Sequence, residues 1–299
     1  MTTYLITGVT GQVAAGVAAR LAQDHDVVGV ARFSDHSARS ALEDAGVRCV
    51  ATDLTGTDLS AVPTEVDVLA NFAVLKTQRW ARDLRGNARS VGLLMGHVRP
   101  AAVLHCSSTG VYRPAGATVL DEDAPLGDNH AAIMPTYSIT KIAAEEVVRT
   151  MAQHLSIPTT IARLNVPYGV GPDGSARGWP AFHLAMMAAG APIPVHPDRP
   201  NLFNPIDLRD IAATLPSLVD AASVEVTTVN WAGSEQVSLE QWCEHLAERT
   251  GLQARFEVTD ATIGGVTVDT SLLASLGGST SVQWRDGFDD LAAAYLSGS

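Results

Sequence analysis

Short apolar runs alternate with longer amphipathic segments through the first half of the chain. The apolar runs are Thr3–Thr7, Val27–Ala31, Arg48–Ala51, Val66–Phe72 and Val103–Ser107. Strands that are buried on both faces, as in a parallel sheet, have this nearly continuous apolar character. The pattern therefore predicts parallel strands at these positions.

Segments with helical spacing lie between these runs. They are Gln12–Gln23, Arg79–Val98 and Thr136–His154. Alternating strands and helices indicate an α/β fold with a doubly wound parallel sheet of the Rossmann type. A further strand is predicted at Ile157–Leu164, directly after the third of these helices.

The composition of the chain changes after Tyr168, where proline and glycine become frequent from Gly169 to Pro205. We predict a Rossmann domain over residues 1–168 and a small C-terminal substrate-binding lobe over residues 169–299, with some elements of the lobe returning to the sheet. The elements predicted in this second part are helices at Trp179–Ala189, Asp210–Asp220, Leu239–Thr250 and Arg285–Leu296 and a strand at Val226–Asn230.

Composition narrows the classes of partner. The chain has 299 residues, 46% of them hydrophobic, and a formal net charge of -12. Nucleic acids and anionic membranes bind proteins through basic patches, so this charge disfavours both as partners. A local basic pocket for a phosphate remains compatible with it.

The cysteines and the N-terminal segment indicate the cellular compartment in which the protein is expected to reside. Cys49, Cys106 and Cys243 are widely spaced and form no C-x-x-C, and the nine histidines show no metal-binding spacing. These features disfavour a disulfide framework or a metal site. The chain enters its first strand without a signal peptide, and no apolar run reaches the ~20 residues that span a bilayer. We expect a soluble cytoplasmic protein.

A glycine-rich turn follows the first predicted strand. Gly8 and Gly11 suit a tight turn whose backbone approaches a pyrophosphate, and Ala14 stands at a third position that serves helix packing. An ordinary strand-to-helix turn is the alternative, but the location at the first strand favours a nicotinamide dinucleotide. The residues expected to contact the cofactor here are Gly8, Thr10, Gly11, Gln12 and Val13.

The end of the second strand bears on the choice between NAD and NADP. Enzymes that use NAD commonly carry Asp or Glu there, to bind the ribose hydroxyls. This chain has Ala31 followed by Arg32. A cation in place of a carboxylate predicts NADP, with NAD possible. The alternative is that Arg32 is a solvated surface residue.

The third and fourth strands end in further candidate cofactor residues. Asp53 and Leu54 follow the third strand, where a side chain can meet the adenine amine. Phe72 and Ala73 end the fourth strand, where the backbone can pass beside the cofactor. The alternative for Asp53 is a turn-forming residue.

Candidate catalytic chemistry lies in Ser108 and in the Y-x-x-x-K segment formed by Tyr137 and Lys141. Residues four apart share one face of a helix, so the phenol and the ammonium would point into one cleft. A nearby cation lowers a tyrosine pKa, and a serine hydroxyl can hold the substrate oxygen while the tyrosine moves a proton.

Taken in order, these segments resemble the extended short-chain dehydrogenase/reductase family, also called the NAD-dependent epimerase/dehydratase family. The resemblance runs from Thr3 to about Leu296. The segments that carry it are G-x-x-G-x-x-A from Gly8, Val66–Ala73, Ser107–Tyr112, Tyr137-x-x-x-Lys141, Arg163–Pro172, Ile206–Ala212 and Val229–Gly233.

The resemblance implies roles for particular residues. Tyr137 would be the general acid/base, and Lys141 would lower its pKa and hold the nicotinamide ribose. Ser108 would orient the substrate, while Asn165 and Val166 would line the nicotinamide end. It also implies a homodimer that pairs the helices Arg79–Val98 and Thr136–His154.

The chain departs from the family pattern at two places that matter for function. Asn71 stands where a histidine is common. Thr109-Gly110 stands where sugar 4,6-dehydratases carry an Asp-Glu pair. The second departure disfavours the dehydratase branch, because no acid–base pair is left for elimination.

The predicted function is NADP(H)-dependent oxidoreduction, which interconverts an alcohol and a ketone or aldehyde on a small molecule. One alternative is an epimerase of a sugar or nucleotide sugar that oxidises its substrate transiently. The other is a catalytically silent protein that binds NADP as a sensor. A nucleotide-diphosphate sugar is disfavoured, because segment Asn201–Asp207 carries no cation, although Arg199 and Arg209 flank it.

Overall fold

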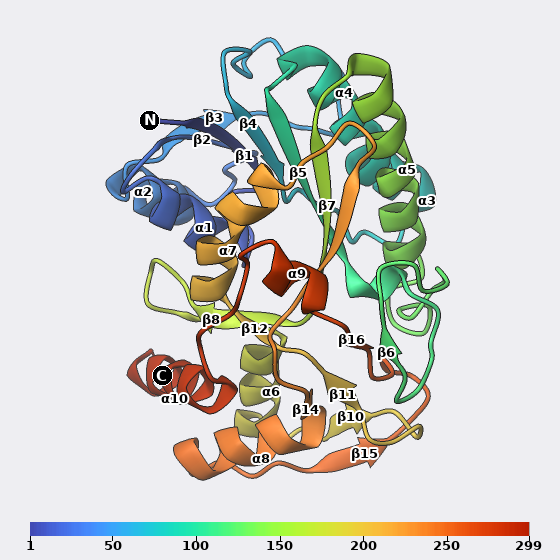
Figure 1. The fold of residues 1–299 in the computed structure, drawn as a ribbon. Helices are drawn as coiled ribbons and strands as arrows, with labels where there is room; N and C mark the ends of the chain where they lie inside the picture. The colour runs from blue at the N-terminus through green and yellow to red at the C-terminus, as the bar shows by residue number, and fades with distance from the viewer. Residues whose placement is uncertain (299) are drawn as a thin grey trace.

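A seven-stranded parallel sheet forms the centre of the molecule in the computed structural model, which describes residues 1–298. Its order is β13-β7-β5-β4-β1-β2-β3 (Figure 1). The strands are β1 (Thr3–Thr7), β2 (Asp26–Ala31), β3 (Arg48–Ala51), β4 (Val68–Asn71), β5 (Ala102–Ser108), β7 (Thr159–Leu164) and β13 (Thr227–Trp231). This order confirms the predicted doubly wound α/β fold.

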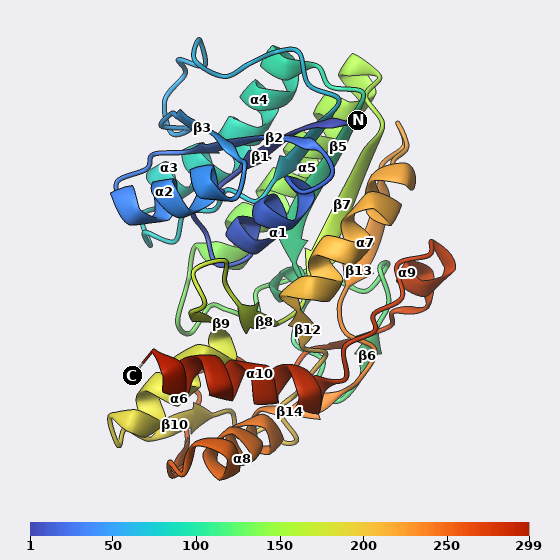
Figure 2. The ribbon, with the colours of Figure 1, turned by 90° about the vertical axis from the view of Figure 1, so that its left-hand side faces the viewer.

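Helices cover both faces of the sheet (Figure 2). One face is covered by α1 (Ala14–Leu21) and α7 (Leu208–Asp220), and the other by α4 (Ser90–Val98) and α5 (Tyr137–Leu155). Each face buries its own apolar core, because successive strand residues point to opposite sides. α2 (His36–Asp44) was not predicted, since Leu42 is its only buried residue.

The predicted helix Arg79–Val98 is interrupted. It consists of α3 (Trp80–Leu84), a π-helical turn at Arg85–Arg89, and then α4. The turn presents Asn87, whose side chain accepts from Leu75 N at 2.6 Å and donates to Thr140 Oγ1 at 2.9 Å. The Asn87 side chain, in this π-helical turn, thus anchors the loop after β4 to the start of α5.

A smaller lobe packs below the carboxyl ends of the strands (Figure 1). Its larger elements are α6 (Trp179–Ala188), α8 (Leu239–Thr250) and α10 (Trp284–Ser297). Their core is aromatic, with the Trp242 ring in contact with both Trp179 and Phe288. The shorter elements of the chain are β6 (Val119–Leu120), β8 (Pro167–Val170), β9 (Ala176–Gly178), β10 (Ile193–Val195), β11 (Leu202–Phe203), β12 (Ile206–Asp207), β14 (Val237–Ser238), β15 (Phe256–Val258), β16 (Thr267–Val268) and α9 (Ser271–Ser275).

Two elements after residue 168 belong with the sheet. β13 pairs with β7, and α7 packs against α1. The division into residues 1–168 and 169–299 stays a prediction. No helix of the described residues is long and apolar enough to cross a membrane.

The two helices that the dimer prediction invoked pack against each other within the chain. Val91, Leu94 and Met95 of α4 are completely buried, and Val147 of α5 closes over Gly92. These side chains are therefore used inside the fold. A dimer through this side would need other, exposed residues.

A buried ion pair joins α5 to the sheet. Arg163 of β7 donates to Glu145 of α5 at 2.8 Å, and both side chains are almost fully buried. Ser107 of β5 donates to the same carboxylate at 2.5 Å. Arg163 also donates to the hydroxyl of Tyr112 at 3.1 Å. The network ties one helix to two strands.

We predict that Glu145→Ala lowers the free energy of unfolding by about 3–5 kcal/mol, because it leaves the Arg163 guanidinium buried without a counterion. The matched control is Glu146→Ala, which removes the exposed carboxylate one residue away and should change stability by less than about 1 kcal/mol. Urea unfolding of both variants measures this. Equal losses would show that the buried pair does not hold α5 in place.

Candidate active site

A cavity of about 580 Å³ lies between the carboxyl edge of the sheet and the smaller lobe. The glycine turn after β1, the end of β5 and the start of α5 form its sheet side. Ligand sites of open α/β folds lie at this edge. The fold therefore places the cavity where the sequence predicted chemistry.

The glycine turn leaves no room for a side chain at its first position. Gly8 has φ +66°, and a Cβ there would lie 2.8 Å from the Ala73 Cα. Gly11 N donates to the Gly8 carbonyl at 2.8 Å, which closes the turn before α1. The result is an open cradle of backbone at a helix N-terminus, which suits a pyrophosphate.

A second cavity, of about 190 Å³, continues from the other side of the same turn. Arg32, Thr52 and Asp53 line it, together with Gly8 and Phe72, which also line the main cavity. Thr52 Oγ1 is buried and has no hydrogen-bond partner in the described residues. Buried hydroxyls are normally paired, so this one fits a ligand group. The two cavities together suit the two halves of a dinucleotide.

Asp35, the first acidic residue after β2, caps a helix and does not line the second cavity. Asp35 caps α2 and accepts from Ser37 N at 2.9 Å and from Ser37 Oγ at 2.7 Å. These hydrogen bonds hold the pKa of the Asp35 carboxyl below its usual value. Arg32 is the charged side chain from this segment that lines the cavity.

The structure brings together nearly all of the predicted site residues. Each lines one or both cavities except Asn165. Asn165 is buried, donates to the Val266 carbonyl at 3.0 Å and accepts from Asn204 N at 3.3 Å. Its amide holds the smaller lobe against β7. Val166, the next residue, does line the main cavity.

Ser108, Tyr137 and Lys141 meet at the inner end of the main cavity. The Ser108 side chain lies close enough to Tyr137 to influence its phenol, and its hydroxyl accepts from Gly110 N at 3.1 Å. Lys141 Nζ donates to the Cys106 carbonyl at 2.7 Å. The three groups come from β5 and from one face of α5, as the spacing of Tyr137 and Lys141 predicted.

The protonation of Tyr137 differs from the expectation. Burial raises the pKa of Tyr137 to about 12, and the nearby Ser108 hydroxyl offsets only part of that shift. Burial also lowers the pKa of the Lys141 ammonium. Desolvation is the largest influence on Tyr137, so its side chain is a phenol at neutral pH.

A buried hydrogen-bond chain supports the backbone beside the glycine turn. Thr7 Oγ1 donates to Asn71 Oδ1 at 2.6 Å, and Asn71 Nδ2 lies 2.9 Å from His105 Nδ1. Ala73 N donates to Thr7 Oγ1 at 3.2 Å. Asn71, which replaces the common histidine, thus bridges three strands and fixes the segment that faces Gly8.

Two ionisable residues that the sequence analysis missed also line the main cavity. Lys76 Nζ lies 5.0 Å from the centre of the Tyr137 ring, and the His130 ring lies 5.0 Å from the same ring. Both follow regular elements on long loops, so no strand or helix periodicity marked them. Burial lowers the pKa of Lys76, and burial together with Lys76 lowers the pKa of His130 to about 4.

The outer walls of the cavity are apolar. Phe182 of α6 is 60% exposed, at the rim of the cavity. Other large apolar residues of the lining include Ile133, Met134, Val166, Trp179, Phe203, Ile263 and Val266. Of the residues suggested from sequence, Trp179 and Phe203 line the cavity, whereas Met186 packs in the core of the smaller lobe. The lining residues include two lysines and no arginine.

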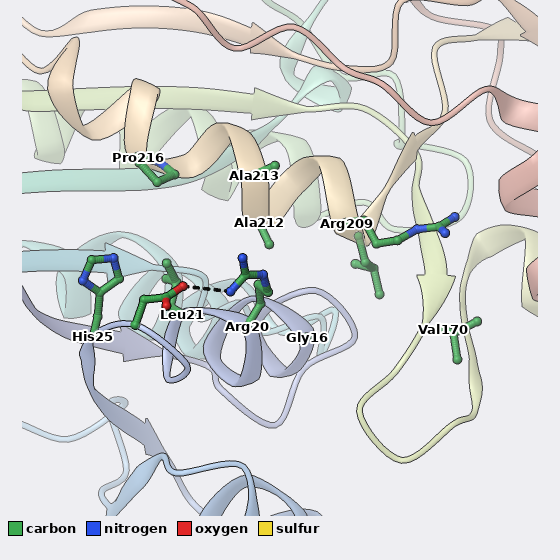
Figure 3. A pocket seen from close by; sticks show the side chains of 11 residues that line it. Gly16, Arg20, Leu21, His25, Val170, Arg209, Ala212, Ala213 and Pro216 are labelled. Carbon is green, nitrogen blue, oxygen red and sulfur yellow. Dashed lines mark hydrogen bonds and ion pairs between the residues drawn. The ribbon is translucent and has the colours of Figure 1, made fainter.

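A separate hollow of about 330 Å³ lies between α1 and α7 and shares no lining residue with the main cavity. Figure 3 shows Arg20 and Arg209 at this hollow. Arg20 forms an ion pair with Asp24 at 3.0 Å. Arg209 pairs with Asp207 and Asp290 at 2.9 Å each. Both guanidinium groups are therefore engaged within the fold. The described residues contain no cluster of side chains that could hold a metal ion.

Comparison with known proteins identifies related sequences and folds. A model of the NAD dependent epimerase/dehydratase family matches residues 4–227, about three quarters of the chain. No curated protein matches the sequence. Similar folds are found among solved structures of nucleotide-sugar epimerases.

One is a UDP-glucose-4-epimerase from Stenotrophomonas maltophila with bound NAD and formylated UDP-arabinopyranose, at TM-score 0.84 and 19% identity, covering 100% of this chain and 99% of that one. Another is a mutant UDP-glucuronic acid 4-epimerase from Bacillus cereus in complex with NAD and a fluorinated UDP-glucuronic acid, at TM-score 0.83 and 19% identity, covering 99% and 100%. A third is a UDP-glucose 4-epimerase from Bifidobacterium longum with NAD+ and UDP, at TM-score 0.80 and 18% identity, covering 99% and 98%. At these identities the likeness establishes the fold.

Proposed function

The chain belongs to the NAD dependent epimerase/dehydratase family, and we propose that it transfers hydride between a nicotinamide cofactor and an alcohol or carbonyl carbon of a small molecule. The observation that carries this proposal is the meeting of Ser108, Tyr137 and Lys141 in the cavity that the glycine turn opens. The bound nicotinamide supplies the hydride acceptor or donor.

The protein groups move the proton and orient the substrate. Ser108 would hold the substrate oxygen, and Tyr137 would give that oxygen a proton on reduction or take it on oxidation. Lys141 lies one helical turn from Tyr137 and would bind the nicotinamide ribose. Its positive charge would stabilise the phenolate whenever Tyr137 is deprotonated.

The first candidate for the overall reaction is epimerisation by transient oxidation. The nicotinamide would take up and return the hydride, while Tyr137 would take the proton from the substrate oxygen and give it back to that oxygen. Return of the hydride to the opposite face of the carbonyl carbon would invert that carbon and regenerate the cofactor. The similar solved structures are 4-epimerases, which supports this form of the reaction.

The second candidate is net reduction of a ketone or aldehyde. The pKa of Tyr137, raised to about 12, keeps the proton on the phenol at neutral pH, which is the form that donates to a carbonyl oxygen. A reductase consumes one cofactor per turnover, whereas an epimerase consumes none. A catalytically silent sensor would bind cofactor without either reaction.

The lining of the cavity bears on the substrate class. A buried diphosphate needs cations or helix N-termini in place of its water. Arg199 lies 3.7 Å from Glu240 and Arg209 is paired with two aspartates, and neither lines the cavity. Of the two lysines that line it, Lys141 donates to the Cys106 carbonyl, and burial lowers the pKa of Lys76. We therefore propose a hydroxylated or carbonyl compound with an apolar body and no diphosphate.

The choice between NAD and NADP rests on opposing observations. The similar solved structures contain NAD, which favours NAD for this chain. Arg32 lines the second cavity and Asp35 is occupied as a helix cap, which favours a 2′-phosphate there. We retain NADP binding through Arg32 as the proposal, to be decided by titration.

Replacing Tyr137 by Phe should leave folding and cofactor binding intact and lower turnover by about 10²–10⁴-fold, since it removes the proton donor. NADPH and NADH oxidation against a panel of small ketones and aldehydes measures this. Tyr4→Phe, the same change at a buried position of β1 outside both cavities, is the control. Turnover near that of the control would remove Tyr137 from its role.

Wild-type protein should bind NADPH about tenfold or more tightly than NADH, and Arg32→Ala should abolish that preference. A charge-assisted contact to phosphate contributes roughly 1.5–3 kcal/mol. Fluorescence titration of both cofactors measures the preference, with Arg20→Ala as an arginine control outside both cavities. Equal or tighter NADH binding by wild type would instead establish an NAD enzyme.

UDP-glucose should bind the NAD-loaded protein no more tightly than about 1 mM, because the cavity lining has no arginine for the diphosphate. Calorimetry with UDP-glucose and UDP-glucuronic acid measures this. Micromolar binding that is lost in Arg199→Ala or Arg209→Ala would overturn the substrate class and favour a nucleotide-sugar epimerase.

We also propose a homodimer, through the exposed side of α3 and α5. Trp80, Leu84 and Ile139 are 49%, 38% and 39% exposed there, and Val91, Leu94 and Met95 are excluded because they are buried in the chain. Light scattering at micromolar concentration should give twice the monomer mass, and Trp80→Asp should give a monomer. A wild-type monomer would contradict the proposal.

A further inference from the structure

The carboxylate of Asp83, on α3, is completely buried and forms no ion pair with the described residues. Two threonines donate to it. Thr77 donates from its backbone N–H at 3.1 Å and from Oγ1 at 2.5 Å, and Thr136 donates from Oγ1 at 2.7 Å. Burial alone would raise the pKa of Asp83, but hydrogen bonds from both threonines outweigh burial and hold that pKa below its usual value. Asp83 is therefore an anion that ties the loop after β4 to the start of α5.

The two threonines adjoin a pair of residues that meet at the main cavity. Thr77 follows Lys76, and Thr136 precedes Tyr137. Lys76 Nζ lies 5.0 Å from the centre of the Tyr137 ring, and an ammonium at this distance is attracted to the ring electrons. The tie through Asp83 thus fixes the two segments whose next residues form this contact.

A second tie lies four residues further along, in the π-helical turn. Asn87 Oδ1 accepts from Leu75 N at 2.6 Å, and Asn87 Nδ2 donates to the Leu75 carbonyl and to Thr140 Oγ1 at 2.9 Å each. Leu75 precedes Lys76, and Thr140 lies almost one helical turn after Tyr137. Each member of the lysine–tyrosine pair is therefore held on both of its sides.

Other titratable groups also lie beside Tyr137. His130 contacts its ring, Lys141 lines the inner end of the cavity, and Cys106 lies near the phenol. Burial and Lys76 hold the pKa of His130 at about 4, so this imidazole is neutral at physiological pH. Burial raises the pKa of Cys106 to about 11, so it is a thiol. The cations beside Tyr137 are therefore Lys76 and Lys141.

We propose that Asp83 is a positioning residue that holds the Lys76 ammonium against the ring of Tyr137. This rests on the proposed function, in which Tyr137 moves a proton to or from the substrate oxygen. A cation beside the ring favours the phenolate, which is the form that takes a proton from an alcohol. The rival role is structural, in which the hydrogen bonds of Asp83 only stabilise the fold.

A fluorinated tyrosine in place of Tyr137 tests the contact, because its phenol ionises at lower pH than that of tyrosine and its phenolate has a distinct absorbance. The pKa of this probe is measured in the full chain, freed of bound nucleotide. It is measured in the otherwise unchanged protein and with Lys76→Met, Asp83→Ala or both. Glu146→Ala, which removes an exposed carboxylate of α5, is the control for loss of a charge.

Lys76→Met should raise the pKa of the probe by about one unit or more, since it removes a nearby cation. Asp83→Ala should raise it too, because Lys76 loses its position, and should add little once Lys76 is already replaced. The direction separates the two roles. If Lys76 stayed in place, removal of the Asp83 anion would favour the phenolate and lower the pKa of the probe. Glu146→Ala should leave it unchanged.

An unchanged or lowered pKa in Asp83→Ala, an unchanged pKa in Lys76→Met, or full additivity of the two changes would each overturn the assignment of Asp83. If Asp83→Ala does not fold, Thr136→Val takes its place with the same expected rise. That variant keeps the shape of the side chain and removes one donor to Asp83. The proposed function fails separately: turnover retained by Tyr137→Phe would remove Tyr137 from proton transfer and leave the pKa shifts of the probe as they are.

Discussion

The site depends on the buried ion pair between Glu145 and Arg163, because this pair fixes α5 against the sheet. Glu145 lies one helical turn beyond Lys141 and two beyond Tyr137, so all three side chains leave the same face of α5. Ser107 donates to Glu145, and its neighbour Ser108 faces the cavity. The distance between the proposed acid/base and the proposed substrate-orienting serine is therefore set by a contact in the core. A carboxylate and a guanidinium removed from water are tolerated here because each is met by several partners.

Much of the fold and part of the site follow from local sequence rules. Strands buried on both faces leave apolar runs, so β1 was predicted with its observed bounds. β3 was also predicted with its observed bounds, although it is a partly exposed edge strand. Gly8 could be identified because only glycine fits a left-handed turn packed on the Ala73 backbone. Tyr137 and Lys141 lie on a regular helix, whose spacing fixes their common direction. The family resemblance supplied their roles, and the match to residues 4–227 confirms the family.

The rest of the site depends on contacts between segments that are distant in the sequence. Lys76 and His130 come from loops, where no periodicity shows which way a side chain points, and they meet only over the Tyr137 ring. Asn165 was placed at the cofactor because of its motif, yet its amide binds the backbone of the smaller lobe. The raised pKa of Tyr137 likewise results from burial that a sequence does not reveal. Substrate selectivity should depend on these tertiary contacts, which bring two lysines, one histidine and apolar side chains together in the cavity.

The central claim is that both cavities form one groove, which places a nicotinamide ring against Tyr137 and Ser108. A crystal structure of the protein with NAD or NADP tests it most directly. The account predicts the pyrophosphate over the turn at Gly8 and Gly11, the adenosine in the cavity lined by Thr52 and Asp53, and the nicotinamide beside Tyr137 with C4 facing open space where a substrate carbon fits at roughly 3–3.5 Å. A nicotinamide ring directed away from Tyr137, or a cofactor bound outside these cavities, would contradict it.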